Sequence, residues 1–214
     1  MLETQLLLGN GVAILLAAVV PIYLTIRLKN NLRKLTAILS IFILMHAVYC
    51  WLDFLGFEWL SDAIFEPLSA AVLILFGIYY YEVAKQKKAS IKKMVVIWSP
   101  VTLLFIFYSA LMSYVTVILL LAALSIFVWL AALSRNIKSF QFQISIFIVI
   151  WVSGQVVGIL QDNGIIVLSP LLGDISLEIH VVSLVFLSIM IWLRFYYSER
   201  SGRRIIEDLD ATLR

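Results

Sequence analysis

The sequence predicts an all-α integral membrane protein with seven transmembrane helices, and three observations support this fold class. Hydrophobic residues make up 63% of the 214 residues and charged residues only 14%, with a mean hydropathy of +1.05. A soluble domain has about 45–50% apolar and about 25% charged residues. The second observation is a series of apolar stretches of about 20 residues, the length that crosses a bilayer. The third is that every Lys and Arg falls on one side of the predicted bundle.

The apolar stretches are separated by short polar segments, and each predicts one span. They cover about residues 5–28, 35–56, 62–84, 94–110, 113–134, 140–161 and 175–197. The fourth and fifth come from one apolar run between Met94 and Ser134, which at about 40 residues is long enough for two crossings. The spans form one transmembrane domain over residues 1–200, and residues 201–214 form a short polar, weakly amphipathic cytoplasmic tail.

The basic residues follow the ends of the first, third, fifth and seventh spans. The sixteen are Arg27, Lys29, Arg33, Lys34, Lys85, Lys87, Lys88, Lys92, Lys93, Arg135, Lys138, Arg194, Arg200, Arg203, Arg204 and Arg214. Cytoplasmic loops of membrane proteins carry an excess of Lys and Arg. We therefore expect a cell-membrane protein with its N-terminus outside and its C-terminus in the cytoplasm, which requires an odd number of spans.

The acidic residues divide differently, because eight of the thirteen lie in the outer half of the predicted bundle. These eight are Glu3, Asp53, Glu58, Asp62, Glu66, Asp162, Asp174 and Glu178. An acidic outer mouth concentrates cations and repels anions. The alternative is that membrane insertion alone explains the charge pattern, since acidic residues contribute little to orientation. The basic inner side also favours anionic lipid headgroups.

The chain resembles itself at a shift of about 105 residues. Residues 31–43 align with residues 136–148, and both contain Ser-Ile-Phe-Ile near the start of a span. With a seven-residue insertion in the outer loop, Glu66 of the third span aligns with Glu178 of the seventh. The first three spans thus resemble the last three, with the fourth as a connector. Sites in repeat membrane proteins commonly lie between the halves.

This three-plus-one-plus-three plan, with the N-terminus outside, resembles the plan of microbial opsins and SWEET-type sugar carriers. The resemblance implies a helical bundle with a site between its halves. It concerns the number and order of the spans and does not include shared sequence motifs. Opsins hold retinal through a Lys in the middle of the last span, where this chain has no Lys between Ser183 and Ser188. SWEET-type carriers typically show a Pro-Gln pair, which this chain lacks. No cofactor is therefore predicted.

His46 is the deepest ionisable residue in the predicted spans and lies near the membrane midplane. An ionisable group at the centre of a span costs about 2.5–3.5 kcal/mol on insertion scales, so it marks a functional candidate. Tyr49, Cys50 and Asp53 follow His46 at i+3, i+4 and i+7 and share its helix face. The face indicates either a binding or proton-relay site, or a helix contact in which the imidazole donates to Ser or a carbonyl.

Polar residues in other spans extend this set. Gly154 and Gly158 permit close helix approach, and Gln155 between them needs a buried partner. Glu66 and Glu178 are either stabilised in the first turn of a helix by its dipole, or they face each other and share a proton or a cation. The candidate residues for binding a solute or cation are His46, Tyr49, Asp53, Glu66, Gln155, Glu178 and His180.

No metal site is predicted from these residues. Glu178 and His180 are two positions apart on a helix, hence about 200° apart around its axis, and cannot both point at one centre. A haem between His46 and His180 is not expected either, because the sequence places His46 near the midplane and His180 about one turn inside the outer edge.

The sequence contains no nucleophile–base pair, phosphate loop or cofactor fingerprint, so neither an enzyme nor a nucleic-acid-binding protein is expected. The preferred hypothesis is a carrier or binding protein for a small solute or cation. Its outward-facing acidic cavity would be lined by His46, Asp53, Glu66 and Glu178. One alternative is a receptor-like sensor whose pocket is closed on the inner side and which signals to a cytoplasmic partner through the basic loops and tail. Another is a structural subunit of a larger membrane complex.

Overall fold

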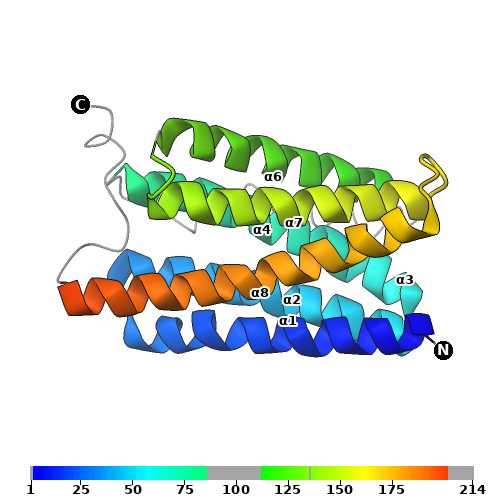
Figure 1. The fold of residues 1–214 in the computed structure, drawn as a ribbon, viewed down its shortest axis with the longest axis horizontal. Coiled ribbons are helices and arrows are strands. Elements are labelled where there is room, and N and C mark those ends of the chain that lie inside the picture. The colour runs from blue at the N-terminus through cyan, green and yellow to red at the C-terminus, as the bar shows by residue number, and fades with distance from the viewer. Residues whose placement is uncertain (1, 86–111, 135, 202–214) are drawn as a thin grey trace.

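The computed structural model describes residues 2–85, 112–134 and 136–201, and every regular element in these residues is helical (Figure 1). The elements in chain order are α1 Leu2–Arg27, α2 Asn30–Phe54, α3 Glu58–Leu60, the π-helical turn η1 Ser61–Phe65, α4 Glu66–Ala84, α6 Met112–Ser134, α7 Phe140–Asp162 and α8 Pro170–Ser201.

Six helical segments of the described residues are long and apolar enough to cross a membrane, which suggests a membrane protein. They are Leu8–Arg27, Asn30–Phe54, Glu58–Ala84, Tyr114–Ser134, Phe140–Asp162 and Glu178–Ser201. These segments confirm the helices predicted for the first, second, third, fifth, sixth and seventh spans. The predicted fourth span, 94–110, and residues 202–214 of the predicted tail lie outside the described residues.

The long helices pack as a closed ring. Along it, α1 contacts α2, α2 contacts α4, α4 contacts α6, α6 contacts α7, α7 contacts α8, and α8 contacts α1. Large buried side chains such as Phe42, Phe76, Phe127 and Trp151 come from four of these helices. Leu16, in contrast, is 66% exposed on the outer surface. Because lipid tails are as apolar as leucine, close packing inside the ring rather than transfer from water holds the helices together.

The approach of α4 to α6 depends on Gly77. A Cβ at this position would lie 2.9 Å from Cγ2 of Ile126 and 3.2 Å from the ring of Phe127. At Gly158, in contrast, an added Cβ would meet nothing within 4 Å, so the prediction that this glycine permits close helix approach is wrong. Gly77 of α4 therefore permits a close helix approach, whereas Gly158 of α7 does not need to be glycine for packing.

Short turns reverse the chain at two places on the way round the ring. Gly56 after α2 and Gly164 after α7 adopt φ values of +80° and +68°, a conformation that side chains with a Cβ rarely take. Before α7, the Oγ of Ser139 accepts a hydrogen bond from the backbone N–H of Phe142 and caps the helix. These turns place α7 antiparallel to both α6 and α8.

The helix directions give the bundle two chemically different ends. Figure 1 shows α1, α4, α6 and α8 all ending on the same side, so α4 runs parallel to its neighbour α6 and α8 runs parallel to α1. Every described Lys and Arg lies toward this side, which we call the basic end. The opposite side, where α2 and α7 end, carries Asp53, Asp62 and Asp162, and we call it the acidic end.

Neither Glu66 nor Glu178 lies at a free helix N-terminus. Residues Glu58–Ala84 form a continuous helical segment through η1, and the backbone N–H of Glu66 donates to the carbonyl oxygen of Ser61. The helix α8 begins at Pro170, more than two turns before Glu178. The interpretation that the helix dipole and free N–H groups of a first turn stabilise these acids is therefore wrong for both.

Candidate functional site

His46 lies in the middle of α2 and is completely enclosed by aromatic rings. Its side chain is 0% exposed. The imidazole stacks on the ring of Tyr49 with 5.4 Å between centroids, and it meets the indole of Trp151 edge to face at 5.0 Å. Neither ring nitrogen of His46 has a hydrogen-bond partner among the described residues. A buried polar atom without a partner costs about 1–3 kcal/mol, so the enclosure of this imidazole calls for an explanation.

The ring of His180 on α8 also contacts the imidazole of His46. Its side chain is 4% exposed, and its ring centroid lies 5.6 Å from that of His46 in an edge-to-face arrangement. The expectation that these two histidines lie at different depths is therefore wrong. Counting residues along each span ignores the relative tilt and offset of α2 and α8, and these bring the two rings into contact.

Glu66 and Gln155 form a second buried pair between α4 and α7. The Nε2 of Gln155 donates to Oε1 of Glu66 at 3.0 Å, and the two side chains are 7% and 6% exposed. This bond supplies the partner that the sequence predicts for Gln155. The Oε1 of Gln155 and the Nε1 of Trp151, one turn earlier on α7, have no hydrogen-bond partner among the described residues. Buried polar atoms without a hydrogen-bond partner in the described residues thus lie on α7 as well as on α2.

Tyr49 connects the two groups of residues. It stacks on His46, and its hydroxyl is within electrostatic range of the carboxylate of Glu66. We call His46, Tyr49, Glu66, Gln155 and His180 the buried polar cluster. Five of the seven candidate residues named from the sequence therefore come together between α2, α4, α7 and α8.

Acidic groups surround the cluster toward the acidic end. Glu66 interacts electrostatically with Asp62, Asp162 and Asp53, which come from η1, α7 and α2. Asp53 is half-buried, and the Oγ of Ser61 donates to Oδ1 of Asp62 at 3.1 Å. Because the described Lys and Arg residues lie at the other end of the bundle, negative charge gathers on this side of the cluster.

Glu178 lies apart from the buried polar cluster. It is partly exposed, and its side chain makes no hydrogen bond or ion pair with any residue that the structure describes. Its carboxylate is also not among the groups that interact with Glu66. The contact predicted between these two acids is thus not found, and Glu66 bonds to Gln155 instead.

No cluster of three or more His, Cys, Asp or Glu side chains within the described residues has the geometry of a metal site. His46 and His180 supply imidazole nitrogens from two helices, and the rings of Tyr49 and Trp151 also contact that of His46.

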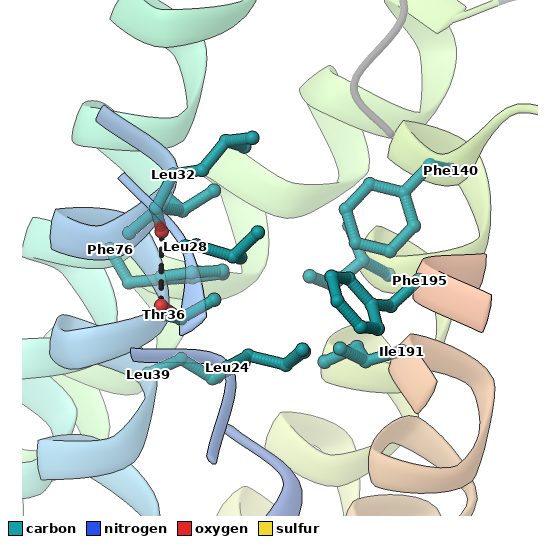
Figure 2. Close-up of a pocket in the computed structure, with 11 residues that line it drawn as sticks. Leu24, Leu28, Leu32, Thr36, Leu39, Phe76, Phe140, Ile191 and Phe195 are labelled. Carbon is teal, nitrogen blue, oxygen red and sulfur yellow. Dashed lines mark hydrogen bonds between the residues drawn. The ribbon is translucent and has the colours of Figure 1, made fainter. Parts of the chain in front are cut away.

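The half of the ring toward the basic end contains buried polar side chains, such as Gln141 and Ser145, and an apolar cavity. A cavity of about 30 Å³ lies there, lined by eleven residues of which Thr36 is the only polar one. Figure 2 shows Leu24, Leu39 and Phe76 facing Ile191 and Phe195 across it. The Oγ1 of Thr36 donates to backbone carbonyls of its own helix and not into the cavity. Apolar side chains thus line this cavity, which lies between the buried polar cluster and the basic end.

The sequence analysis did not identify Trp151, whose ring contacts His46 of the buried polar cluster. One signal could have indicated it, because a shift of 105 residues places His46 of the first half on Trp151 of the second. The aromatic residue opposite the histidine could therefore have been named from the alignment.

Comparison with known proteins finds no matching family model, no similar curated protein and no similar solved structure. The class of protein consequently follows from the chain itself: an all-helical bundle whose described residues include six helices long and apolar enough to cross a membrane. Its buried polar cluster lies inside the ring and not on the face that lipid would cover.

Proposed function

We propose that this chain is a non-enzymatic multi-pass membrane protein that binds a small cation or small polar solute at the buried polar cluster. The observation that carries the proposal is the pair His46 and Glu66. One is fully enclosed with two nitrogens that have no partner among the described residues, and the other is a buried carboxylate with a hydrogen bond from Gln155. Buried polar and charged groups persist when a partner satisfies them, and a bound cation would satisfy the carboxylate of Glu66 and the lone pair of one imidazole nitrogen.

The surroundings of the cluster favour a positive ligand. Asp53, Asp62 and Asp162 attract cations toward the acidic end, and the described basic residues are at the opposite end. The faces of Tyr49 and Trp151 beside His46 attract an ammonium-type cation through their π-electrons. A small cation with an organic or ammonium character would thus find a carboxylate and two aromatic rings in one place.

We further propose seven spans in the cell membrane, with the N-terminus outside and the C-terminus inside. The parallel direction of α4 and α6 supports this count, because the chain must cross the bundle once more to connect Lys85 with Met112. The predicted fourth span, 94–110, falls between these two residues and would supply that crossing. The gathering of basic residues at one end supports the orientation.

An internal repeat is part of the same proposal, and the burial pattern supports it. Eight of the ten buried residues of α2 fall on buried residues of α7 after a shift of 105 positions. The helix contacts also correspond, since α1–α2, α2–α4 and α4–α6 have counterparts in α6–α7, α7–α8 and α8–α1. His46 and Trp151, which are equivalent under this shift, touch each other. The site would then lie at the axis between the halves.

The second candidate function is a receptor-like sensor with a separate cytoplasmic partner. The specific observation in its favour is the apolar layer of Leu24, Phe76 and Ile191 around the cavity that lies between the cluster and the basic end. A carrier must open this layer during its cycle, whereas a sensor transmits a change of helix packing through it. The two functions share the ligand site and differ in whether the ligand crosses.

The test of the proposal is ligand-dependent stabilisation of the purified protein. A panel of Na⁺, K⁺, Mg²⁺, Ca²⁺ and choline would be added in mild detergent while thermal unfolding is followed. A ligand at 100 times its Kd stabilises the folded state by about 2.7 kcal/mol. We expect at least one cation to raise the Tm of the wild type and not that of Glu66→Gln. The matched control is Glu178→Gln, which removes a carboxylate outside the cluster and should keep the response. Absence of any response in the wild type, or an unchanged response in Glu66→Gln, would disprove cation binding at the buried polar cluster.

A further inference from the structure

A groove runs along the outer surface of the bundle between α7 and α8, separate from the buried polar cluster. It has a volume of about 900 Å³, and its walls include Ile146 and Phe147 of α7 and Phe186, Ile189 and Leu193 of α8. Phe186, Ile189 and Leu193 are 54%, 48% and 46% exposed, so they face outward from the ring. In a membrane this apolar surface lies against lipid tails.

The groove ends at an arginine that is fixed in place but has no acidic partner among the described residues. Arg194 donates from Nε and Nη2 to Oε1 of Gln143 at 3.1 and 2.9 Å, and from Nη2 to the backbone carbonyl of Lys138. It makes no ion pair with any described residue, whereas Arg27 pairs with Glu199 at 3.5 Å. A guanidinium has five N–H donors, so the two on Nη1 remain available.

The neighbours of Arg194 extend this positive site toward water. Lys138 is exposed and lines the same groove, and Tyr197 lines it with 62% of its surface exposed. All three residues lie at the basic end of the bundle, at the level where α7 begins and α8 approaches its end. A ligand that fills the groove therefore needs a negative group at one end and an apolar chain beside it.

We propose that this groove is a specific site for an anionic phospholipid of the inner leaflet. The lipid phosphate binds Nη1 of Arg194 and the ammonium of Lys138, and one acyl chain lies between α7 and α8. Basic pockets between helices on the cytoplasmic side are suited to anionic headgroups, and a guanidinium recognises phosphate through paired N–H donors. A helix of a protein partner fits less well, because it would have to bring a carboxylate to the same depth in the membrane.

The test compares phosphatidylglycerol with phosphatidylcholine of identical acyl chains, titrated into the purified full-length protein and followed by native mass spectrometry. We expect tighter binding of phosphatidylglycerol, and a loss of about fivefold in that preference in Arg194→Gln, since each basic residue near the surface contributes about that factor. The matched control is Arg200→Gln, which removes an exposed arginine lying over the ring of Tyr196 at the same end of the bundle and should leave the preference unchanged.

Two further variants keep the test decisive if Arg194→Gln does not fold. Lys138→Gln should also reduce the preference, and Met190→Trp should fill the groove and weaken binding of both lipids. Equal binding of the two lipids by the wild type would overturn the proposal. Competition by inorganic phosphate as effective as by phosphatidylglycerol would show a site for free phosphate and overturn the lipid assignment. If the lipid-free protein is a dimer and Met190→Trp dissociates it, the groove binds a second copy of the chain. That result would also overturn the lipid proposal.

Discussion

His46 of α2 and Trp151 of α7 meet edge to face at the centre of the bundle, with 5.0 Å between their ring centroids. The helices α2 and α7 are not adjacent in the ring, so these two side chains span its interior. Each ring is almost completely buried, and each carries at least one nitrogen without a hydrogen-bond partner in the described residues. One contact therefore contributes both to the packing of the core and to the polarity of the proposed site.

Two substitutions of His46 should separate these contributions. His46→Phe keeps a ring against Trp151 and removes the two nitrogens, so we expect unfolding stability equal to or above that of the wild type and no ligand-induced rise in Tm. His46→Ala leaves a cavity and should lower the free energy of unfolding by about 2–5 kcal/mol. Thermal or denaturant unfolding in detergent measures both. A ligand response retained in His46→Phe would show that the imidazole is a packing residue.

Glu66 and Gln155 should be energetically coupled through their hydrogen bond of 3.0 Å. We expect Gln155→Ala to lower the free energy of unfolding by about 1–3 kcal/mol, because it leaves a buried carboxylate without its donor. Glu66→Gln removes the charge but can still accept from Nε2 of Gln155, so its effect on unfolding should be smaller. A double-mutant cycle between Glu66→Ala and Gln155→Ala measures the coupling directly. Additive effects of the two changes would contradict the bond.

Gly77 should tolerate no side chain. Its replacement by Ala places a Cβ 2.9 Å from Ile126 and should destabilise the bundle by about 1–3 kcal/mol, because α4 and α6 must move apart. Gly158→Ala is the matched control, since nothing lies within 4 Å of the added Cβ and alanine favours a helix. Unfolding curves of the two variants should therefore separate clearly. Equal stabilities would mean that the α4–α6 approach is looser than described.

The proposed orientation is tested by labelling single cysteines from outside intact cells. The native Cys50 is 4% exposed and should be silent to a membrane-impermeant maleimide. A cysteine in place of Asn163, in the turn after α7, should be labelled, and one in place of Asn136, before α7, should be spared. Permeabilised cells provide the control, because Asn136→Cys should then react. Labelling of Asn136→Cys in intact cells would reverse the orientation.

The extents of the helices could be predicted because hydropathy and charge act along the chain. The predicted span 140–161 matches α7 at Phe140–Asp162, and the predicted span 113–134 matches α6 at Met112–Ser134. Within each helix, the hydrophobicity of the residues differs little from one face to another, since every face of a membrane helix is largely apolar. The polar residues were therefore the only guide to which face points inward.

The relations between helices could not be predicted in the same way. The contact of His46 with His180 depends on the offset of α2 against α8, which no count along either span provides. The sequence predicted that Gln155 needs a buried partner, but it did not indicate which residue this is, because Glu66 is 89 residues away in the chain. The π-helical turn η1 has no sequence signal that we recognised, although it leads directly into Glu66.

The apolar layer around the cavity of Figure 2 has an electrical consequence for a charged ligand. Leu24, Phe76 and Ile191 line this cavity with apolar atoms, so in the proposed membrane orientation part of the membrane potential would fall across this layer. An elementary charge that crosses the whole potential gains or loses about 2.3 kcal/mol per 100 mV. Under the proposed function and orientation, a cation bound at Glu66 would lie on the outer side of this layer. The occupancy of the cation site should therefore depend weakly on voltage. The rate at which the cation crosses the apolar layer should depend on it strongly.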